Sequence, residues 1–365
     1  MLKIGYKASA EQFTPSRLLE FSCLAEQVGF DSVFVSDHFQ PWRHTGGHAP
    51  YSFAWMGAVG ARTSRIMIGT SVVTPTFRYH PSVVAQAMGT LGAMFPDRMI
   101  LGVGTGESLN EVPAIGIKWP GFKERFGRLK ESIVLMNRLW REERVSFEGQ
   151  YYRTENATIY DRPDNPVPIY IAAAGPTAAK LAGEVADGFI CTSGKPAELY
   201  RETLLPNVAA GLASAGRPAD GLDRMIELKV SFDTDKQEAL ADTRYWAALA
   251  LSAEEKTSVG DPLQMEKHRR CPAAGTGGKP LDRFNRSGRA GRADPALCRT
   301  GIPPPRIPRA RTGSGEVSSS VFRAGDPQAA RRVRLTAAFR IPARSPDAEN
   351  AAGSGRHRER WSARS

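Results

Sequence analysis

Cysteine is scarce in this chain, and long apolar runs are missing altogether. The four cysteines, Cys23, Cys191, Cys271 and Cys298, form no CxxC pair and no Cys/His cluster, which excludes a disulfide framework and a zinc site. No apolar run approaches the ~20 residues of a membrane-spanning helix. The first residues, MLKIGYKAS, are typical of a β-strand and not of a signal peptide. We therefore expect a cytoplasmic protein with no metal site and no membrane partner.

The positive charge of the chain is unevenly distributed. The 365 residues carry a formal net charge of +11, which by itself suggests nucleic acid or a membrane surface as a partner. Residues 268–365, however, hold 20 arginines, one lysine and seven acidic residues, a net charge of +14. The first 267 residues hold 28 basic and 31 acidic side chains and so carry −3. The body of the chain therefore has the composition of an ordinary, mildly acidic protein.

Short β-rich apolar runs alternate with longer amphipathic stretches over the first 232 residues. The pattern predicts seven strands, at Leu2–Ala8, Ser32–Ser36, Ile66–Val73, Met99–Val103, Pro168–Ala173, Gly188–Thr192 and Met225–Phe232. It predicts helices at Pro15–Val28, Pro81–Phe95, Pro120–Trp140, Pro176–Ala186 and Ala197–Ser214, several of which begin at proline. Seven βα units in series indicate a parallel sheet covered by helices, either a doubly wound sheet or a (β/α)₈ barrel.

Polar residues follow the ends of several of these strands, at 36–38, 74–76, 104–107 and 192–195. A barrel draws its catalytic residues from many strand ends, whereas an open sheet concentrates its site at one switch point. We therefore predict a (β/α)₈ barrel with about seven of its eight units present, in a domain that spans residues 1–267.

The tail of residues 268–365 does not continue this pattern. It is rich in Arg, Pro, Ala, Gly and Ser and has only four aromatic residues, so we expect it to be disordered. A basic tail that binds nucleic acid is one interpretation, although such tails usually contain lysine and aromatic residues for base stacking. A shifted reading frame is the other. Reading the codons from Lys267 onward one base later permits a periodic sequence that includes a strand-like HHLVFHAP segment, so we interpret the tail as frameshift-derived.

Four clusters after the strand ends carry side chains suited to chemistry. Histidine titrates near neutral pH, so His38 suits proton transfer, with Trp42 four residues on, although the pair Asp37–His38 taken alone more often marks a buried structural histidine. Glu107 follows a glycine-rich turn and is a candidate acid or base. Small residues at 172–175 permit a ligand to approach closely, and the helix that follows them can bind phosphate at its N-terminus. Thr192, Lys195 and Lys256 suit a substrate phosphate, although a lone lysine is more often a surface charge.

Together these runs resemble a known family. GYKASAEQF, VSDHFQPWRH, GTSV, TPTFRY, LGVGTGE, DGFICTSGK and the region around MIELKVSFD are similar to the coenzyme F420-dependent glucose-6-phosphate dehydrogenases, which belong to the luciferase-like barrel superfamily. The resemblance covers essentially all of residues 1–267. It implies hydride transfer from C1 of glucose 6-phosphate to the deazaflavin coenzyme F420, giving 6-phosphoglucono-1,5-lactone.

The resemblance also implies a role for individual residues. His38, Glu107 and Trp42 would be catalytic, with His38 as the base at the C1 hydroxyl, although the division of proton roles between His38 and Glu107 is left open. The deazaflavin would be held by Asp37, Thr74, Asn110, Ala174, Gly175, Thr177 and Ala178, and the sugar phosphate by Thr192, Lys195 and Lys256. A non-prolyl cis peptide is expected at Ser71–Val72, and a homodimer is expected for the folded protein.

The chain departs from the family pattern at one further phosphate ligand. The family places an arginine beyond residue 267, and in the shifted frame that arginine spans the codons of Pro280 and Leu281. Without the eighth unit, the first and last strands of the barrel would have unpaired edges. We therefore expect a chain that is prone to aggregation and poorly active. The remaining alternatives are another F420- or FMN-dependent luciferase-like oxidoreductase and, for the tail alone, nucleic-acid binding.

Overall fold

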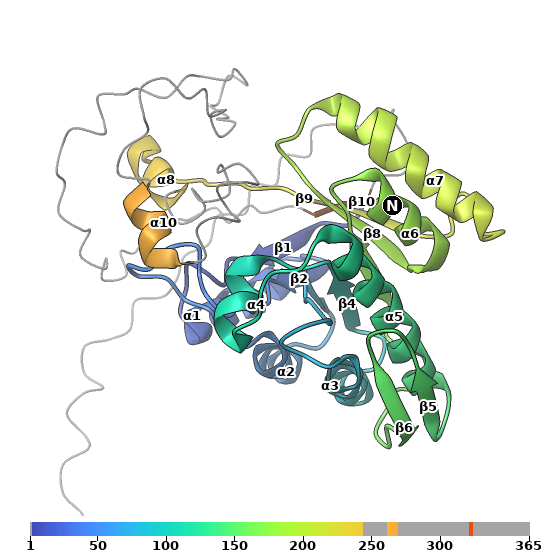
Figure 1. Cartoon of the computed structure of the whole chain (residues 1–365). Coiled ribbons are helices and arrows are strands. Elements are labelled where there is room, and N and C mark those ends of the chain that lie inside the picture. Colours follow the sequence, from blue (N-terminus) through green and yellow to red (C-terminus); the bar gives the residue numbers. More distant parts are fainter. Residues whose placement is uncertain (1, 244–260, 269–320, 324–365) are drawn as a thin grey trace, which may run out of the picture.

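The computed structural model describes residues 2–243, 261–268 and 321–323, and seven parallel strands form its centre (Figure 1). Each strand pairs with the next along the chain, apart from the insertion of a small hairpin after the fourth. Val33, for example, is paired with Tyr6 on one side and with Ile68 on the other. The strands are β1 (Gly5–Ala8), β2 (Ser32–Val35), β3 (Met67–Thr70), β4 (Met99–Val103), β7 (Ile169–Ala172), β8 (Gly188–Thr192) and β9 (Asp223–Glu227). The predicted barrel with seven strands is confirmed.

An additional short strand lies at the seam of the barrel. β10 (Val321–Arg323) pairs antiparallel with β9, with Phe322 opposite Ile226, and it also contacts β1. The expectation that the edge of the last parallel strand would be unpaired is therefore wrong over these three residues, because the backbone of a distant segment pairs with it. The rest of the tail, and with it the predicted disorder of residues 268–365, lies outside the described residues.

Helices cover the outside of the strands (Figure 1). They are α1 (Pro15–Gln27), α2 (Ser52–Arg62), α3 (Pro81–Met94), α5 (Phe122–Arg141), α6 (Pro176–Val185) and α7 (Leu205–Ser214), the last preceded by the π-helical turn η1 (Leu199–Leu204). Proline occupies the first turn of α1, α3 and α6, as predicted. At α1 the hydroxyl of Thr14 also accepts a hydrogen bond from the backbone N–H of Arg17, which caps the helix. These starts place each helix directly after the loop that leaves a strand end.

Several elements were not predicted from the sequence. They are α2, α4 (Ser108–Ile115), the hairpin of β5 (Val145–Glu148) and β6 (Arg153–Ala157), α8 (Lys236–Asp242) and α10 (Pro262–His268). Five predicted strands are also shorter than expected, β2 and β7 by only one or two residues and three others by more. β1 begins at Gly5, β3 ends at Thr70 directly before the cis peptide Ser71–Val72, and β9 ends at Glu227. The cis peptide lies where the family resemblance placed it.

Two apolar layers hold the barrel together. The larger lies between strands and helices, and the smaller fills the barrel interior with Phe34, Ile100, Tyr170, Ile190 and Met225, one from each of five strands. Glycine makes room for the interior aromatics, because a Cβ at position 69 would overlap the ring of Phe34 and one at position 188 the ring of Tyr170. Large and small residues alternate in this way in packed barrel interiors.

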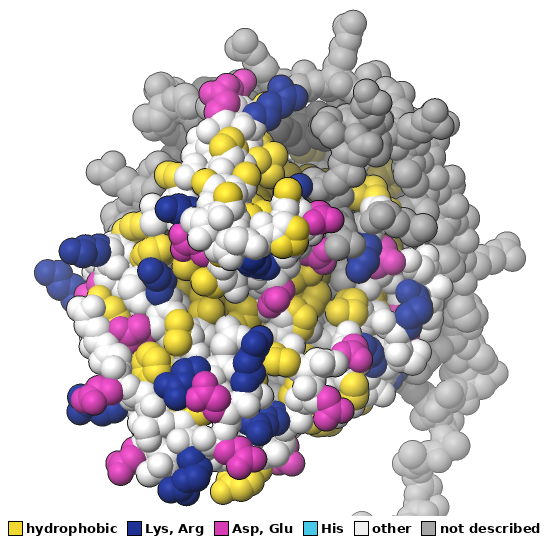
Figure 2. Space-filling model, turned by 90° about the vertical axis from the view of Figure 1, so that its right-hand side faces the viewer, with side chains coloured by type: hydrophobic (Ala, Val, Ile, Leu, Met, Phe, Trp, Pro, Cys, Tyr) yellow, Lys and Arg dark blue, Asp and Glu magenta, His cyan; other side chains and the backbone are white. Residues whose placement is uncertain are grey.

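The surface seen in Figure 2 carries acidic and basic side chains side by side over the described residues, as the near-neutral charge of the body predicts. Within the described part of the chain, no helix is both long and apolar enough to cross a membrane.

Candidate functional site

The carboxyl ends of the parallel strands surround a large cavity. Its volume is about 500 Å³, and its walls come from the segments that follow β2, β3, β4 and β7. Small residues dominate two of these walls, at 104–106 and 172–175. All seven residues predicted to hold the cofactor line it, namely Asp37, Thr74, Asn110, Ala174, Gly175, Thr177 and Ala178.

A smaller cavity of about 160 Å³ lies next to the large one. Its lining comes from both ends of the barrel sequence, with Lys7, Glu11 and Trp42 on one side and residues 227–230, which follow β9, on the other. His38, Ser71 and Glu107 line both cavities, so the two predicted acid–base residues stand at the boundary between them.

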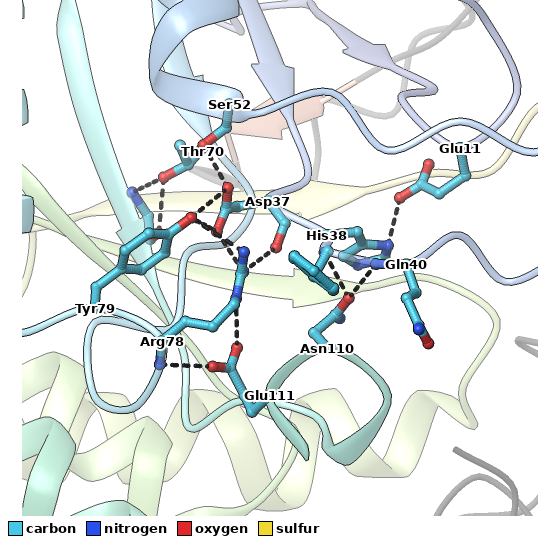
Figure 3. Close-up of polar contacts among 12 residues, drawn as sticks. Glu11, Asp37, His38, Gln40, Ser52, Thr70, Arg78, Tyr79, Asn110 and Glu111 are labelled. Atoms are coloured by element: carbon cyan, nitrogen blue, oxygen red, sulfur yellow. Dashed lines mark hydrogen bonds and ion pairs between the residues drawn. The ribbon is translucent and has the colours of Figure 1, made fainter. Parts of the chain in front are cut away.

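His38 lies against a buried carboxylate at this boundary. Its Nδ1 lies 2.9 Å from a carboxylate oxygen of Glu11 (Figure 3), and its ring meets that of Trp42 edge to face with centroids 5.5 Å apart. Burial opposes the charge on the imidazole, but the carboxylates of Glu11 and Glu107 outweigh it and raise the pKa of His38. For Glu11, burial is likewise outweighed by His38 and Lys7, which lower its pKa to about 2.

Asp37, the neighbour of His38, is held in a buried polar network (Figure 3). Its carboxylate accepts hydrogen bonds from the hydroxyls of Ser52 at 2.7 Å and Tyr79 at 3.0 Å, and from the Arg78 guanidinium at 2.7 Å. These three donors fix the carboxylate of Asp37, and with it the part of the large cavity's wall next to His38.

Helix α4 fixes the same loop from the other side. The side-chain oxygen of Asn110 accepts hydrogen bonds from the backbone N–H groups of Phe39 at 2.9 Å and Gln40 at 3.4 Å. Its neighbour Glu111 forms an ion pair with Arg78, so the guanidinium bridges the loop after β2 and helix α4. The loop that carries His38 is therefore held by three segments: α2 through Ser52, the segment after β3 through Arg78, and α4 through Asn110.

Two of the residues predicted to bind phosphate, Thr192 at the end of β8 and Lys195 after it, line neither cavity. Thr192 is paired with Glu227 of β9, which does line the smaller cavity. The hydroxyl of Tyr200 donates to the carbonyl of Thr192 at 2.7 Å and accepts from the N–H of Lys195 at 3.3 Å, which shapes this turn. Lys256, the third predicted phosphate ligand, lies outside the described residues.

Comparison with known proteins identifies the family. Residues 2–296 match the luciferase-like monooxygenase family. A relative from Nakamurella multipartita, an F420-dependent glucose-6-phosphate dehydrogenase, is 64% identical over 266 residues, which cover 73% of this chain and 78% of the relative. A relative of the same name from Mycolicibacterium smegmatis is 61% identical over 268 residues, with 73% and 80% covered. This chain belongs to the luciferase-like monooxygenase family.

Solved structures agree with this membership. An F420-dependent secondary alcohol dehydrogenase, solved with an F420–acetone adduct, is similar with a TM-score of 0.69 and 37% identity over 73% of this chain and 80% of its own. An F420-dependent tetrahydromethanopterin reductase from Methanopyrus kandleri, at 22% identity and a TM-score of 0.59 over 69% of this chain and 73% of its own, shares the fold.

The polar residues that were not predicted from the sequence include three that line the small cavity and one, Arg78, that supports the loop after β2. Glu11 follows β1, Arg78 follows β3, and Glu227 and Lys229 lie at and after the end of β9. Glu11 and Glu227 lie at or just after strand ends, where polar residues are candidates for a barrel site, but that position does not show the partners of either residue. Arg78 lies eight residues beyond β3 and has no such signal. Among the described residues, no group of three or more His, Cys, Asp or Glu side chains is arranged to hold a metal ion.

Proposed function

We propose that this chain binds F420 in the large cavity and oxidises glucose 6-phosphate at C1, giving 6-phosphoglucono-1,5-lactone. The observation that carries the proposal is the position of His38 and Glu107, which line the large cavity and the small one at once. A reaction between a cofactor and a substrate in adjacent cavities needs its proton-transfer groups at such a boundary.

The large cavity suits a deazaflavin with a ribityl phosphate chain. Its small residues leave room for a planar ring system, and a Cβ built at Gly175 meets no atom within 4 Å, so this wall is open. Gly175 precedes α6, and its position next to the free N–H groups of a helix start suits a phosphate. Asp37, Thr74, Asn110, Ala174, Gly175, Thr177 and Ala178 would hold the coenzyme, which accepts a hydride with its two electrons when bound.

His38 acts as the general base in this proposal. As the C1–H bond breaks and its hydride leaves, the imidazole accepts the proton of the C1 hydroxyl, and C1 and its oxygen become the lactone carbonyl. Glu11 positions the ring and stabilises the imidazolium that forms, since its carboxylate lies 2.9 Å from Nδ1. Glu107 serves the proton-transfer step at the reduced deazaflavin. Trp42 forms an aromatic wall against which the substrate binds.

The phosphate of the substrate is assigned to Thr192, Lys195 and Lys256. Thr192 ends β8 and is paired with Glu227, which lines the small cavity, and Lys195 lies in the turn that follows. The strand pairing thus supports placing the phosphate of the substrate on the side of the small cavity where β8 and β9 end. We also propose that the folded protein is a homodimer, as its resemblance to the family suggests, and light scattering coupled to gel filtration tests this.

The test is reduction of F420 by glucose 6-phosphate, followed as the loss of the visible absorbance of the oxidised coenzyme. The full chain should reduce F420 with glucose 6-phosphate and not with a small secondary alcohol, and His38→Ala should reduce the rate by about 10²–10⁴-fold. His80→Ala is the control, because His80 caps α3 and lines neither cavity. Turnover of the secondary alcohol in preference to the sugar phosphate would contradict the proposed substrate.

A further inference from the structure

The small cavity has a charged wall that the proposed reaction does not use. Glu227, at the end of β9, accepts a hydrogen bond from the Ser71 hydroxyl at 3.0 Å and pairs with two lysines. Its carboxylate lies 3.5 Å from the ammonium of Lys7 and 3.8 Å from that of Lys229. Burial opposes the charge of Glu227, but the two lysines outweigh it and lower its pKa, so the carboxylate stays ionised between them.

The two lysines differ in what they do. Lys7 donates a hydrogen bond of 2.6 Å to the carbonyl of Ser71, and its side chain is 14% exposed, so it is built into the barrel. The side chain of Lys229 is 27% exposed, and its distance from Glu227 is longer than a charge-assisted hydrogen bond of about 2.7–2.9 Å. Glu227 thus holds the ammonium of Lys229 beside the cavity, and the N–H groups of Lys229 make no short hydrogen bond with this carboxylate.

The lining as a whole selects a polyhydroxylated ligand. The lining combines carboxylates, which accept hydrogen bonds, with ammonium groups, which donate them, and it has one aromatic residue besides His38, Trp42. Hydroxyl groups both donate and accept, so a sugar ring can satisfy both kinds of group, while an apolar alcohol would leave them unpaired in a desolvated site.

We propose that Lys229, positioned by Glu227, donates a hydrogen bond to a ring hydroxyl of the sugar and so determines specificity for the hexose ring. The inference rests on the proposed function, since it places the sugar in the small cavity, but it adds a contact away from both C1 and the phosphate. A hydrogen bond from a charged group contributes about 1.5–3 kcal/mol, which corresponds to roughly 10–150-fold in affinity.

The experiment is a calorimetric titration of the full chain, without cofactor, with glucose 6-phosphate and with inorganic phosphate. Lys229→Met keeps the apolar stem and removes the donors. It should weaken binding of glucose 6-phosphate by about 10–150-fold and leave that of inorganic phosphate within about twofold. Lys180→Met is the matched control, because Lys180 also pairs with a glutamate at 3.8 Å but lies on the outer helix α6, and it should change neither affinity. Circular dichroism melting checks that both variants fold.

Deoxy analogues of the sugar phosphate then identify the hydroxyl. One deoxy analogue should bind to the wild type about as weakly as glucose 6-phosphate binds to Lys229→Met. The Lys229→Met variant should bind this analogue and glucose 6-phosphate with equal affinity. Equal affinity of wild type and Lys229→Met for glucose 6-phosphate would overturn the inference and leave the proposed function intact. Binding of phosphate but not of the sugar phosphate by the wild type would overturn the proposed function. If the wild type binds neither ligand, the inference fails for this chain, and F420 reduction decides the proposed function separately.

Discussion

Removal of the Arg78 guanidinium should destabilise the protein strongly. This group is the shared counter-ion of two buried carboxylates, at 2.7 Å from Asp37 and 3.4 Å from Glu111, and its side chain is 9% exposed. Removing one partner of a buried ion pair leaves an uncompensated charge in a poorly solvated place. Such changes usually lower the free energy of unfolding by about 3–5 kcal/mol, and Arg78→Met should lower it by a similar amount.

The loss should depend on pH in a defined direction. Burial already raises the pKa of Glu111, although Arg78 opposes this, so the pKa should rise further in Arg78→Met. A carboxyl group whose pKa is raised in the folded state destabilises that state fully above the raised pKa, and the effect fades as pH falls from there toward the ordinary carboxyl value near ~4. The gap between variant and wild type should therefore be widest at neutral and alkaline pH and shrink toward acidic pH.

Urea unfolding followed by tryptophan fluorescence at pH 8 and pH 5 measures both effects. Arg138→Met is the control, because Arg138 makes an ion pair of the same 2.7 Å length with Glu142 on the exposed face of α5, where such pairs contribute little. A loss below about 1 kcal/mol for Arg78→Met, or an equal loss at the two pH values, would refute the reasoning that Arg78 neutralises two buried carboxylates.

Three further predictions concern the site and the chain end. Glu11→Gln should lower the pKa of His38, because the carboxylate that stabilises the imidazolium is lost; an NMR titration of the imidazole measures it, and an unchanged pKa would contradict the ion pair. Gly175→Leu should weaken F420 binding at least about tenfold without loss of stability, since the new side chain enters open space at the cavity wall. Fluorescence quenching measures the affinity, and Gly121→Leu is the control, because a side chain there also meets open space and Gly121 is not itself part of the cavity lining. Restoring the reading frame after Lys267 should raise soluble yield and turnover together, and no change in either would count against the frameshift.

The fold was predictable because its signal is repeated. Seven apolar runs separated by helical stretches specify a barrel even when individual ends are misplaced, as at β9, which ends at Glu227 and not at Phe232. The missed helix α4 is short and has a proline at position 113 inside it, so its local pattern is weak. The hairpin of β5 and β6 is largely exposed; β5 alternates apolar and polar residues over only four positions, and β6 has a single apolar residue, Ala157.

The site was predictable where a residue type is rare and follows a strand, as with His38 and Glu107. It was not predictable where the role depends on a partner far along the chain. Glu11 and Arg78 are a common acid and a common base in sequence, and only the fold shows that one lies 2.9 Å from His38 and the other joins Asp37 to Glu111. The partner of the Asp37 carboxylate was likewise hidden in the sequence, because the cation that binds it, Arg78, is 41 residues away.

The linings of the two cavities also imply an order of assembly during synthesis. Every residue that lines the large cavity lies between positions 37 and 190, whereas the small one needs residues 227–230. The loop beside Trp42 needs still more of the chain, because Glu266 of α10 accepts a hydrogen bond from the Thr45 N–H at 2.9 Å and pairs with Arg43. A ribosome adds about 5–20 residues each second, so the whole lining of the large cavity is synthesised seconds before residues 227–230 complete that of the small one. The contacts that hold the loop beside Trp42 are completed last, when α10 has been synthesised.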